Sequence, residues 1–146
     1  MDIVPVDTLA MRAKLQRLES EMLKCEQVEI QVKHIFSEGL YAREIFIPKG
    51  TLLTGKIHLT EHLNIISQGD ISVLTEHGMK RIKAPCTIVS SAGIKRAGYA
   101  HEDTVWTTIH ATNETDLEKL EAELIAPDYA ALDETLKIAG DLLCLG

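Results

Sequence analysis

The sequence predicts a mainly β protein, an antiparallel barrel or sandwich with a helix before it and helices after it. Between residues 28 and 112, many short segments rich in β-branched residues follow one another at roughly 8–12-residue spacing, which is typical of such folds. Turn signals such as 68–70 and 91–93 separate these segments. A parallel sheet would need crossover helices, and the short connections leave no room for them. We therefore predict that residues 28–112 form the barrel.

Residues 1–27 are predicted to form an N-terminal helical segment. After Asp7, a suitable N-cap, four apolar residues recur at three- and four-residue steps: Leu15, Leu18, Met22 and Cys25. Such a stripe packs either on the barrel or on a second copy of the chain.

Residues 113–146 are predicted to form an acidic C-terminal helical segment, packed on the barrel or on a neighbouring subunit. Thr115 and Glu118 form a candidate capping box for a helix over 113–125, which Pro127 ends. A second helix is expected from about Tyr129 to 139, where Gly140 supplies a C-cap. The apolar tail 142–145 would dock on the barrel edge or on another subunit.

The charge distribution argues against binding to duplex nucleic acid. The net charge is −7, and residues 113–146 carry all of the excess, with nine acidic and two basic side chains. A protein that binds the phosphate backbone usually presents a basic patch instead. No apolar run approaches the roughly 20 residues that cross a bilayer, and the N-terminus does not resemble a secretory signal. Three scattered cysteines do not suggest a disulfide framework, so we expect a cytoplasmic protein with no membrane partner.

Two stretches of the predicted barrel have a regular spacing of glycines and side chains that bear chemistry. The first runs Gly50, five residues, Lys56-x-His58, three residues, His62, six residues, Gly69. The second runs Pro85, five residues, Ser91-x-Gly93, two residues, Arg96, three residues, Ala100.

This spacing resembles the two motifs of the cupin superfamily, and the resemblance covers residues 50–110. It implies a cupin-type jelly roll. All intervals of the first motif fit, but Lys56 stands at a histidine position and His62 at the glutamate position. In the second motif Gly93 is retained and Arg96 stands at the histidine position. The general character of the chain also resembles cupin-like proteins of tailed phages, which would place it in a host cytoplasm or a virion.

In cupins these positions face into the barrel, where three histidines and a glutamate hold one divalent metal. By position, this chain offers Lys56, His58, His62 and Arg96, and strand alternation places Asn64 on the same face as His62. Protonated Lys and Arg have no lone pair for a metal, so we expect no cofactor, with His58 and His62 as the candidate metal ligands. The two cations would bind a small anionic ligand, such as a phosphate, a nucleotide or a carboxylate. Alternatively Glu44, Glu61, Glu102 or Asp103 neutralises them inside the protein, or the strand register differs and they face solvent.

Further candidates lie near the predicted mouth of the barrel. Tyr99 and Trp106 could stack a planar group of a ligand, although a lone Trp in a strand is more often part of a core. His110 could line the last strand. It is one of the few residues that could supply the third neutral ligand of a metal site.

Three functions are consistent with these patterns. The first is a non-enzymatic protein that binds an anion through Lys56, His58, His62 and Arg96. The second is a structural homo-oligomer, a homodimer or larger, assembled through the helical stripes and the tail. The third is a metal-dependent isomerase, lyase or dioxygenase that uses His58 and His62 with a third ligand such as His110.

Overall fold

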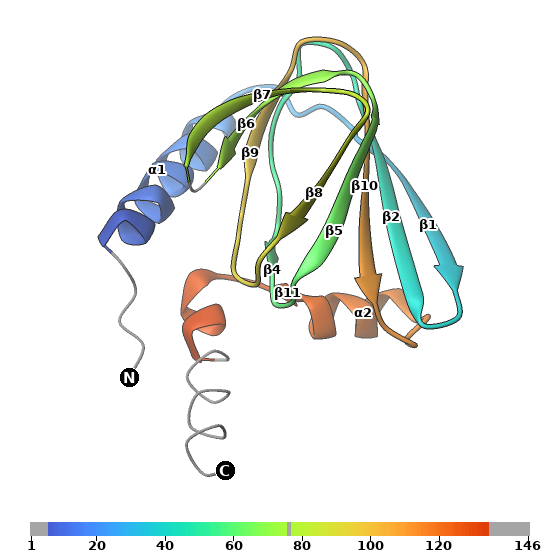
Figure 1. Ribbon diagram of the computed structural model, residues 1–146. Helices are drawn as coiled ribbons and strands as arrows, with labels where there is room; N and C mark the ends of the chain where they lie inside the picture. Colours follow the sequence, from blue (N-terminus) through green and yellow to red (C-terminus); the bar gives the residue numbers. More distant parts are fainter. Residues whose placement is uncertain (1–5, 76, 135–146) are drawn as a thin grey trace.

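The computed structural model describes residues 6–75 and 77–134 (Figure 1). Over these residues the chain forms, in order, α1 (Val6–Met22), β1 (Gln31–Ser37), β2 (Leu40–Ile47), β3 (Leu52–Thr54), β4 (Ile57–His58), β5 (His62–Gln68), β6 (Asp70–Thr75), β7 (Gly78–Lys83), β8 (Cys86–Ser90), β9 (Ala97–Ala100), β10 (Thr104–Ala111), α2 (Leu117–Leu124) and β11 (Ile125–Ala126). Residues 129–134 are helical again.

The strands form two main antiparallel sheets with jelly-roll order. One sheet runs β1-β2-β10-β5-β8 and the other β3-β9-β6-β7, while β11 and β4 form a short pair of their own. Apart from the hairpins β1-β2 and β6-β7, neighbouring strands in each sheet are not consecutive in sequence, as in a pair of interlocked Greek keys. The mainly β fold class with flanking helices is thereby confirmed.

Gly69 allows the tight connection between β5 and β6. Its φ is +112°, a conformation that favours glycine, and an ideal Cβ there would lie 2.6 Å from the Cα of Thr104. The last glycine of the first motif is therefore required by the close approach of the backbone of β10.

The apolar core lies between the two sheets at one end of the molecule. Ile47 of the five-stranded sheet packs with Ile71, Val73 and Ala100 of the four-stranded sheet, and each is at most 1% exposed. At the other end, Leu120 and Leu124 of α2 pack against Tyr41. α2 therefore covers the end of the jelly roll that the apolar core leaves open (Figure 1).

Helix α1 packs on the C-terminal part of the chain. The Arg12 guanidinium binds both carboxylate oxygens of Asp133 at 2.9 and 3.0 Å and lies 4.5 Å from the ring centroid of Tyr129. Leu15 is buried, and Glu19 forms an ion pair with Lys95. The apolar stripe predicted for this helix is shorter than expected, because its last residue, Cys25, is exposed and lies beyond the end of α1.

Several predicted boundaries are wrong. The N-cap of α2 is Asp116, whose carboxylate accepts the backbone N–H groups of Glu118 and Lys119, so Thr115 does not cap it. Residues 125–126 leave the helix and pair with β4. The sequence pattern indicates no strand where β9 lies, and the first strand begins at Gln31, three residues after the predicted start of the barrel region at residue 28. The end of the second C-terminal helix and the apolar tail 142–145 lie outside the described residues.

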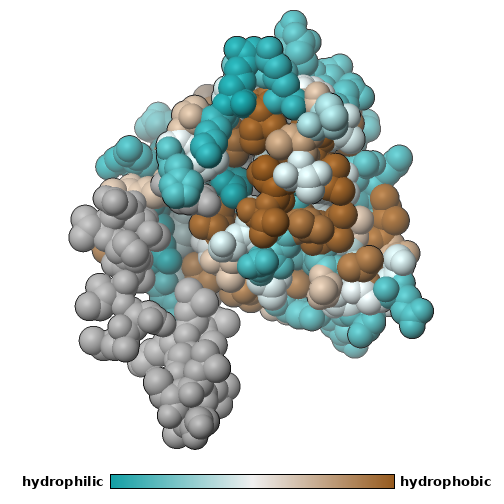
Figure 2. Space-filling view, viewed as in Figure 1, coloured by the Kyte–Doolittle hydropathy of each residue, from teal (hydrophilic) through white to brown (hydrophobic). Residues whose placement is uncertain are grey.

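The outer face of the five-stranded sheet carries a row of apolar side chains. Cross-strand pairing aligns Ile35, Ala42, Ile109, Leu63 and Val89 across all five strands. Ile35, Leu63 and Val89 are between 42% and 56% exposed. Figure 2 shows hydrophobic side chains gathered over β5, β8 and β10. The homo-oligomer proposed from the sequence stays a prediction.

No helix among the described residues is long and apolar enough to span a membrane.

Candidate metal centre

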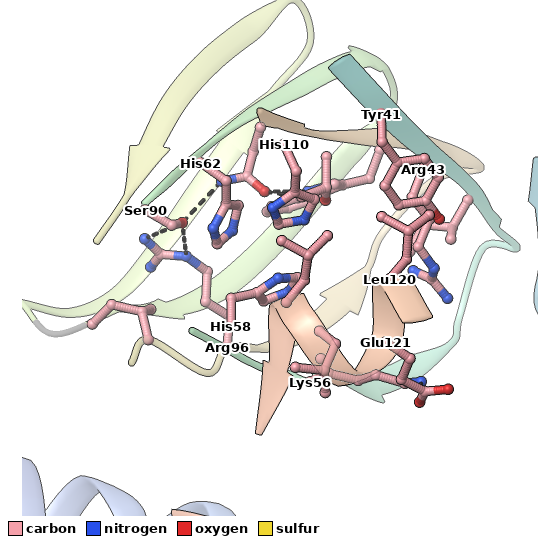
Figure 3. A pocket seen from close by; sticks show the side chains of 18 of the residues that line it. Tyr41, Arg43, Lys56, His58, His62, Ser90, Arg96, His110, Leu120 and Glu121 are labelled. Atoms are coloured by element: carbon pink, nitrogen blue, oxygen red, sulfur yellow. Dashed lines mark hydrogen bonds and ion pairs between the residues drawn. The ribbon is translucent and has the colours of Figure 1, made fainter. Parts of the chain in front are cut away.

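Three histidines from three different strands meet inside the covered end of the jelly roll (Figure 3). His62 begins β5, His110 lies near the end of β10, and His58 ends β4. Ile109 pairs with Leu63, which places His110 and His62 on the inner faces of neighbouring strands. His62 and His110, 48 positions apart in sequence, therefore become neighbours through the register of the sheet.

The three imidazoles are close enough to share one ion. Their ligand nitrogens all lie within 4.8 Å of one another. The ring centroids are 4.2 Å apart for His58 and His62, 4.8 Å for His62 and His110, and 5.1 Å for His58 and His110. Only small movements of the rings would place all three nitrogens at the roughly 2.0–2.1 Å that separates Zn²⁺ from a histidine nitrogen.

The C-terminal segment holds His58 in position. The β11 strand pairs Ile125 with His58, and the backbone N–H of Leu59 donates to the carbonyl of Leu124 at 2.7 Å. On the other side, the N–H of Gly93 donates to the His58 carbonyl at 2.7 Å. The one residue retained from the second motif thus supports the histidine of the first.

The protonation of His62 follows from its hydrogen bond. Nδ1 of His62 lies 2.9 Å from the carbonyl oxygen of Thr60, which can only accept, so Nδ1 carries the proton. The lone pair is then on Nε2. Histidines that bind metals commonly donate their other ring nitrogen to a backbone carbonyl in this way, which fixes the tautomer and orients the ring.

The site keeps all three imidazoles neutral. Burial, and to a lesser extent nearby positive or titrating groups, lowers the pKa of His58 to about 3 and that of His110 to about 4. Burial also lowers the pKa of His62. A neutral imidazole has the free lone pair that a metal needs.

Two ring nitrogens of this cluster are buried without a hydrogen-bond partner. They are Nδ1 of His58 and Nδ1 of His110, two of only three such side-chain atoms found in residues 6–75 and 77–134. Leaving a buried polar atom unsatisfied costs about 1–3 kcal/mol. The donor set therefore fits a bound divalent ion, and three protein ligands are the number usual for catalytic zinc sites, which keep a position open.

The histidines face a cavity of about 350 Å³. Its polar side includes residues from β1, β2, β4, β5, β8 and β10, and its apolar side includes Ile94 and the leucines of α2. Asn64 links the polar side together: its carbonyl oxygen accepts the Trp106 indole N–H at 3.0 Å, and its amide donates to the Ser90 hydroxyl at 2.9 Å. A cavity of this size and composition suits a small organic molecule.

The structure brings most of the predicted site residues together. The cavity is lined by six of them: Lys56, His58, His62, Asn64, Arg96 and Trp106. Tyr99 is not among these, because alternation along β9 turns it outward, where it is 43% exposed and contacts His101.

The two predicted cations differ in their surroundings. Lys56 is exposed and forms an ion pair at 2.7 Å with Glu121 of α2, a partner outside the four acidic residues considered from the sequence. Arg96 is half-buried and donates to the Ser90 hydroxyl through Nε and Nη2 at 3.2 and 3.1 Å. An internal carboxylate thus neutralises Lys56.

Several residues of the cavity wall were not predicted from the sequence, among them His34, Tyr41 and Arg43. Tyr41 and Arg43 of β2 line it, and the Tyr41 hydroxyl lies 2.7 Å from Nδ1 of His34. The signal was present, because Tyr41, Arg43, Ile45 and Ile47 alternate with period two and so share one face of the strand.

Comparison with known proteins identifies the fold. No protein-family model matches the chain, and no curated protein matches its sequence. Among solved structures, KdgF from Halomonas sp. is 18% identical, with a TM-score of 0.52 over 64% of this chain and 90% of that one. A cupin domain from Bordetella pertussis Tohama I is 13% identical, with a TM-score of 0.47 over 60% and 98% of the two chains.

An acetylacetone dioxygenase from Acinetobacter johnsonii is 15% identical, with a TM-score of 0.49 over 58% of this chain and 61% of that one. At such identities the likeness concerns the fold and not the activity, and nothing in it bears on a phage origin. The jelly-roll order of the strands, the spacing of the first motif and the likeness to KdgF agree, and this chain has the cupin fold.

Proposed function

We propose that this chain is a metal-dependent enzyme of the cupin fold, in which His58, His62 and His110 bind one divalent transition-metal ion beside a small-molecule cavity. The observation that carries the proposal is the convergence of three neutral imidazoles from three strands, with ligand nitrogens within 4.8 Å. His58 and His62 alone lacked the third neutral ligand that a catalytic metal site needs, and His110 would supply it.

The donor set favours particular metals. Imidazole suits Zn, Cu, Fe and Ni, whereas Mg and Ca prefer oxygen ligands. Three protein ligands argue for a catalytic site, because structural zinc sites usually have four. When bound, such an ion acts as a Lewis acid that polarises an oxygen of a coordinated molecule.

The protein's own residues would orient the ligands and shield the site. The Thr60 carbonyl fixes the His62 ring, and Gly93 together with β11 fixes the backbone of His58. Leu120 and Leu124 of α2 cover the cavity, which would limit the access of water to a bound molecule. The network of Asn64, Trp106 and Ser90 holds the polar wall in one arrangement.

A metal-free anion-binding protein is the second candidate function. It is supported by the positive character of the cavity wall, which contains three basic side chains and one acidic side chain in a protein of net charge −7. The pairing of Lys56 with Glu121 weakens the role first assigned to Lys56. The two candidates differ in whether the histidines hold an ion.

Metal stoichiometry separates the two candidates. Protein stripped with a chelator and reloaded with Zn²⁺ or Co²⁺ is expected to retain one ion per chain in elemental analysis after gel filtration. His58→Ala and His110→Ala should retain much less. His101→Ala is the matched control, because His101 contacts Ser72 and Tyr99 and lies outside the cavity. Retention of the ion by His58→Ala and His110→Ala, or no retention by the wild type, would refute the metal proposal.

A further inference from the structure

The cavity wall contains a cation that the metal proposal does not use. Arg43 of β2 is half-buried, and it stands opposite Thr108 of β10 and next along the inner face from Tyr41. Figure 3 shows Arg43 and Arg96 on opposite sides of the three histidines, with Arg43 beside Tyr41 and Leu120. Arg43 is close enough to the histidines to lower the pKa values of His58 and His110, after the larger effect of burial.

Arg43 differs from the other half-buried cations in the described ranges. Arg12 binds Asp133, Lys95 binds Glu19, and Arg96 binds the Ser90 hydroxyl. No hydrogen bond or ion pair of the Arg43 side chain occurs among residues 6–75 and 77–134. Glu121, whose pKa Arg43 also helps to lower, is engaged by Lys56 at 2.7 Å and is 61% exposed. Withdrawing a guanidinium from water without a partner is unfavourable, so the site is suited to an anion supplied from outside.

Part of the wall next to Arg43 is apolar. Leu117, Leu120 and Leu124 of α2 line the cavity on this side, and Ile45 follows Arg43 along the inner face of β2. A ligand that fills the space would therefore place an anionic group at Arg43 and an apolar body against α2. A guanidinium binds a carboxylate through two parallel hydrogen bonds, which matches one singly charged planar group to one arginine.

We infer that the cavity binds a small monocarboxylic acid, whose carboxylate pairs with Arg43 and whose hydrocarbon part lies against the leucines of α2. The inference deepens the proposed function, and it rests on it only in taking this cavity as the substrate site. Arg43 replaces Lys56 as the principal anion-binding residue.

A pair of matched probes tests the inference without any metal. Trp106 lines the cavity and is the only tryptophan of the chain, so its fluorescence reports occupancy. Chelator-stripped protein is titrated with hexanoate, with hexanamide, which has the same shape without the charge, and with inorganic phosphate. Hexanoate is expected to bind about tenfold or more tightly than hexanamide, since hydrogen bonds to charged groups are the stronger ones. It should also bind more tightly than phosphate.

Variants assign the preference to one residue. Arg43→Gln should bind hexanoate and hexanamide equally, and Arg43→Lys, which keeps the charge, should retain part of the preference. Lys49→Gln is the control and should preserve it, because Lys49 is exposed, pairs with Glu102 and lies outside the cavity. If Arg43→Gln does not fold, the same assignment is read from Arg43→Lys, whose preference should be weaker than that of the wild type.

Equal binding of hexanoate and hexanamide by the wild type, tighter binding of phosphate, or an undiminished preference in the Arg43 variants would each overturn the inference. The absence of a saturable response to either organic probe would do the same. None of these results depends on metal stoichiometry, so the inference and the metal proposal fail separately.

Discussion

The two ends of the jelly roll are built from the same strands, but one end has an apolar, packed interior and the other has a polar interior. The inner-face residues change along each of three strands. In β2, Tyr41 and Arg43 are followed by Ile45 and Ile47. In β10, His110 and Thr108 give way to Trp106 and Thr104, and in β5, His62 and Asn64 are followed by Ile66. The change takes place within one or two alternations of each strand. A single sheet thus has an apolar end that packs and a polar end that surrounds a cavity.

The two ends are also closed differently. The four-stranded sheet seals the apolar end through Ile71, Val73 and Ala100. At the polar end the cover is α2 with β11, which follow the last strand of the jelly roll. Stability is therefore expected to depend mainly on the first end, and ligand binding on the second. Substitutions and pH can separate the two.

The largest effect on stability is expected at the apolar end. Ile71 is 1% exposed within the core cluster, so Ile71→Ala should lower the free energy of unfolding by about 3–4 kcal/mol through lost burial and a cavity. Urea denaturation measures this. Leu63→Ala, on the exposed outer face, should cost well under about 1 kcal/mol. Equal costs for the two would show that the apolar end does not dominate stability.

The polar end should make the metal-free protein sensitive to acid. The pKa values of His58 and His110 are about 3 and 4 in the folded protein and 6.5 in the unfolded chain. Between pH 6.5 and about 4 the unfolded chain therefore binds more protons, and the free energy of unfolding falls as the pH falls. We expect the free energy of unfolding to fall by about 2–3 kcal/mol over this range. Each pKa unit corresponds to about 1.4 kcal/mol, and the histidines titrate as a coupled group, so their individual contributions do not simply add.

Urea denaturation of chelator-treated protein at several pH values measures this loss. The double variant His58→Gln, His110→Gln should have a flatter profile, while Ile71→Ala should lower the whole curve without changing its slope. A wild-type profile that is flat from pH 7 to 4 would contradict the assignment of buried, neutral histidines.

A smaller effect is expected from replacing two glycines. Both replacements should lower stability, but only one should also disturb the candidate metal site. Gly93 and Gly50 both have positive φ, 86° and 83°, so Gly→Ala should cost about 1 kcal/mol of stability at either position. Only Gly93 holds the carbonyl of His58, and an added Cβ would lie 3.2 Å from Leu132 Cδ2.

Gly93→Ala should therefore weaken Zn²⁺ binding about tenfold, as measured by competition with a chromophoric chelator, whereas Gly50→Ala should not. Equal metal affinities in the two variants would mean that the β4 backbone does not limit the geometry of the site.

Much of the fold could be predicted because it depends on local patterns. Alternation and turn residues indicated most strands, and the interval between Gly50 and Gly69 indicated the cupin fold. Strand β9 was missed because Ala97-Gly-Tyr-Ala100 has little intrinsic strand preference, and its pairing with β3 and β6 makes it a strand. Residues 125–126 were likewise drawn out of the predicted helix by pairing with β4.

The site was less predictable because its contacts depend on register and packing. The sequence places His110 on an inner face, but only the alignment of β10 with β5 brings it to His62. The partner of Lys56 could not be identified because Glu121 reaches it only when α2 covers the cavity. Arg43 could have been found from the period of β2, but its lack of a partner is a tertiary property.

X-ray absorption spectroscopy of the Co²⁺- or Zn²⁺-loaded protein tests the central claim most directly. The account predicts three imidazole nitrogens at about 2.0–2.1 Å with the remaining position filled by a light atom, and a loss of imidazole scattering in His110→Ala. A bound ion with fewer than two imidazoles, or a spectrum unchanged in His110→Ala, would contradict the three-histidine centre.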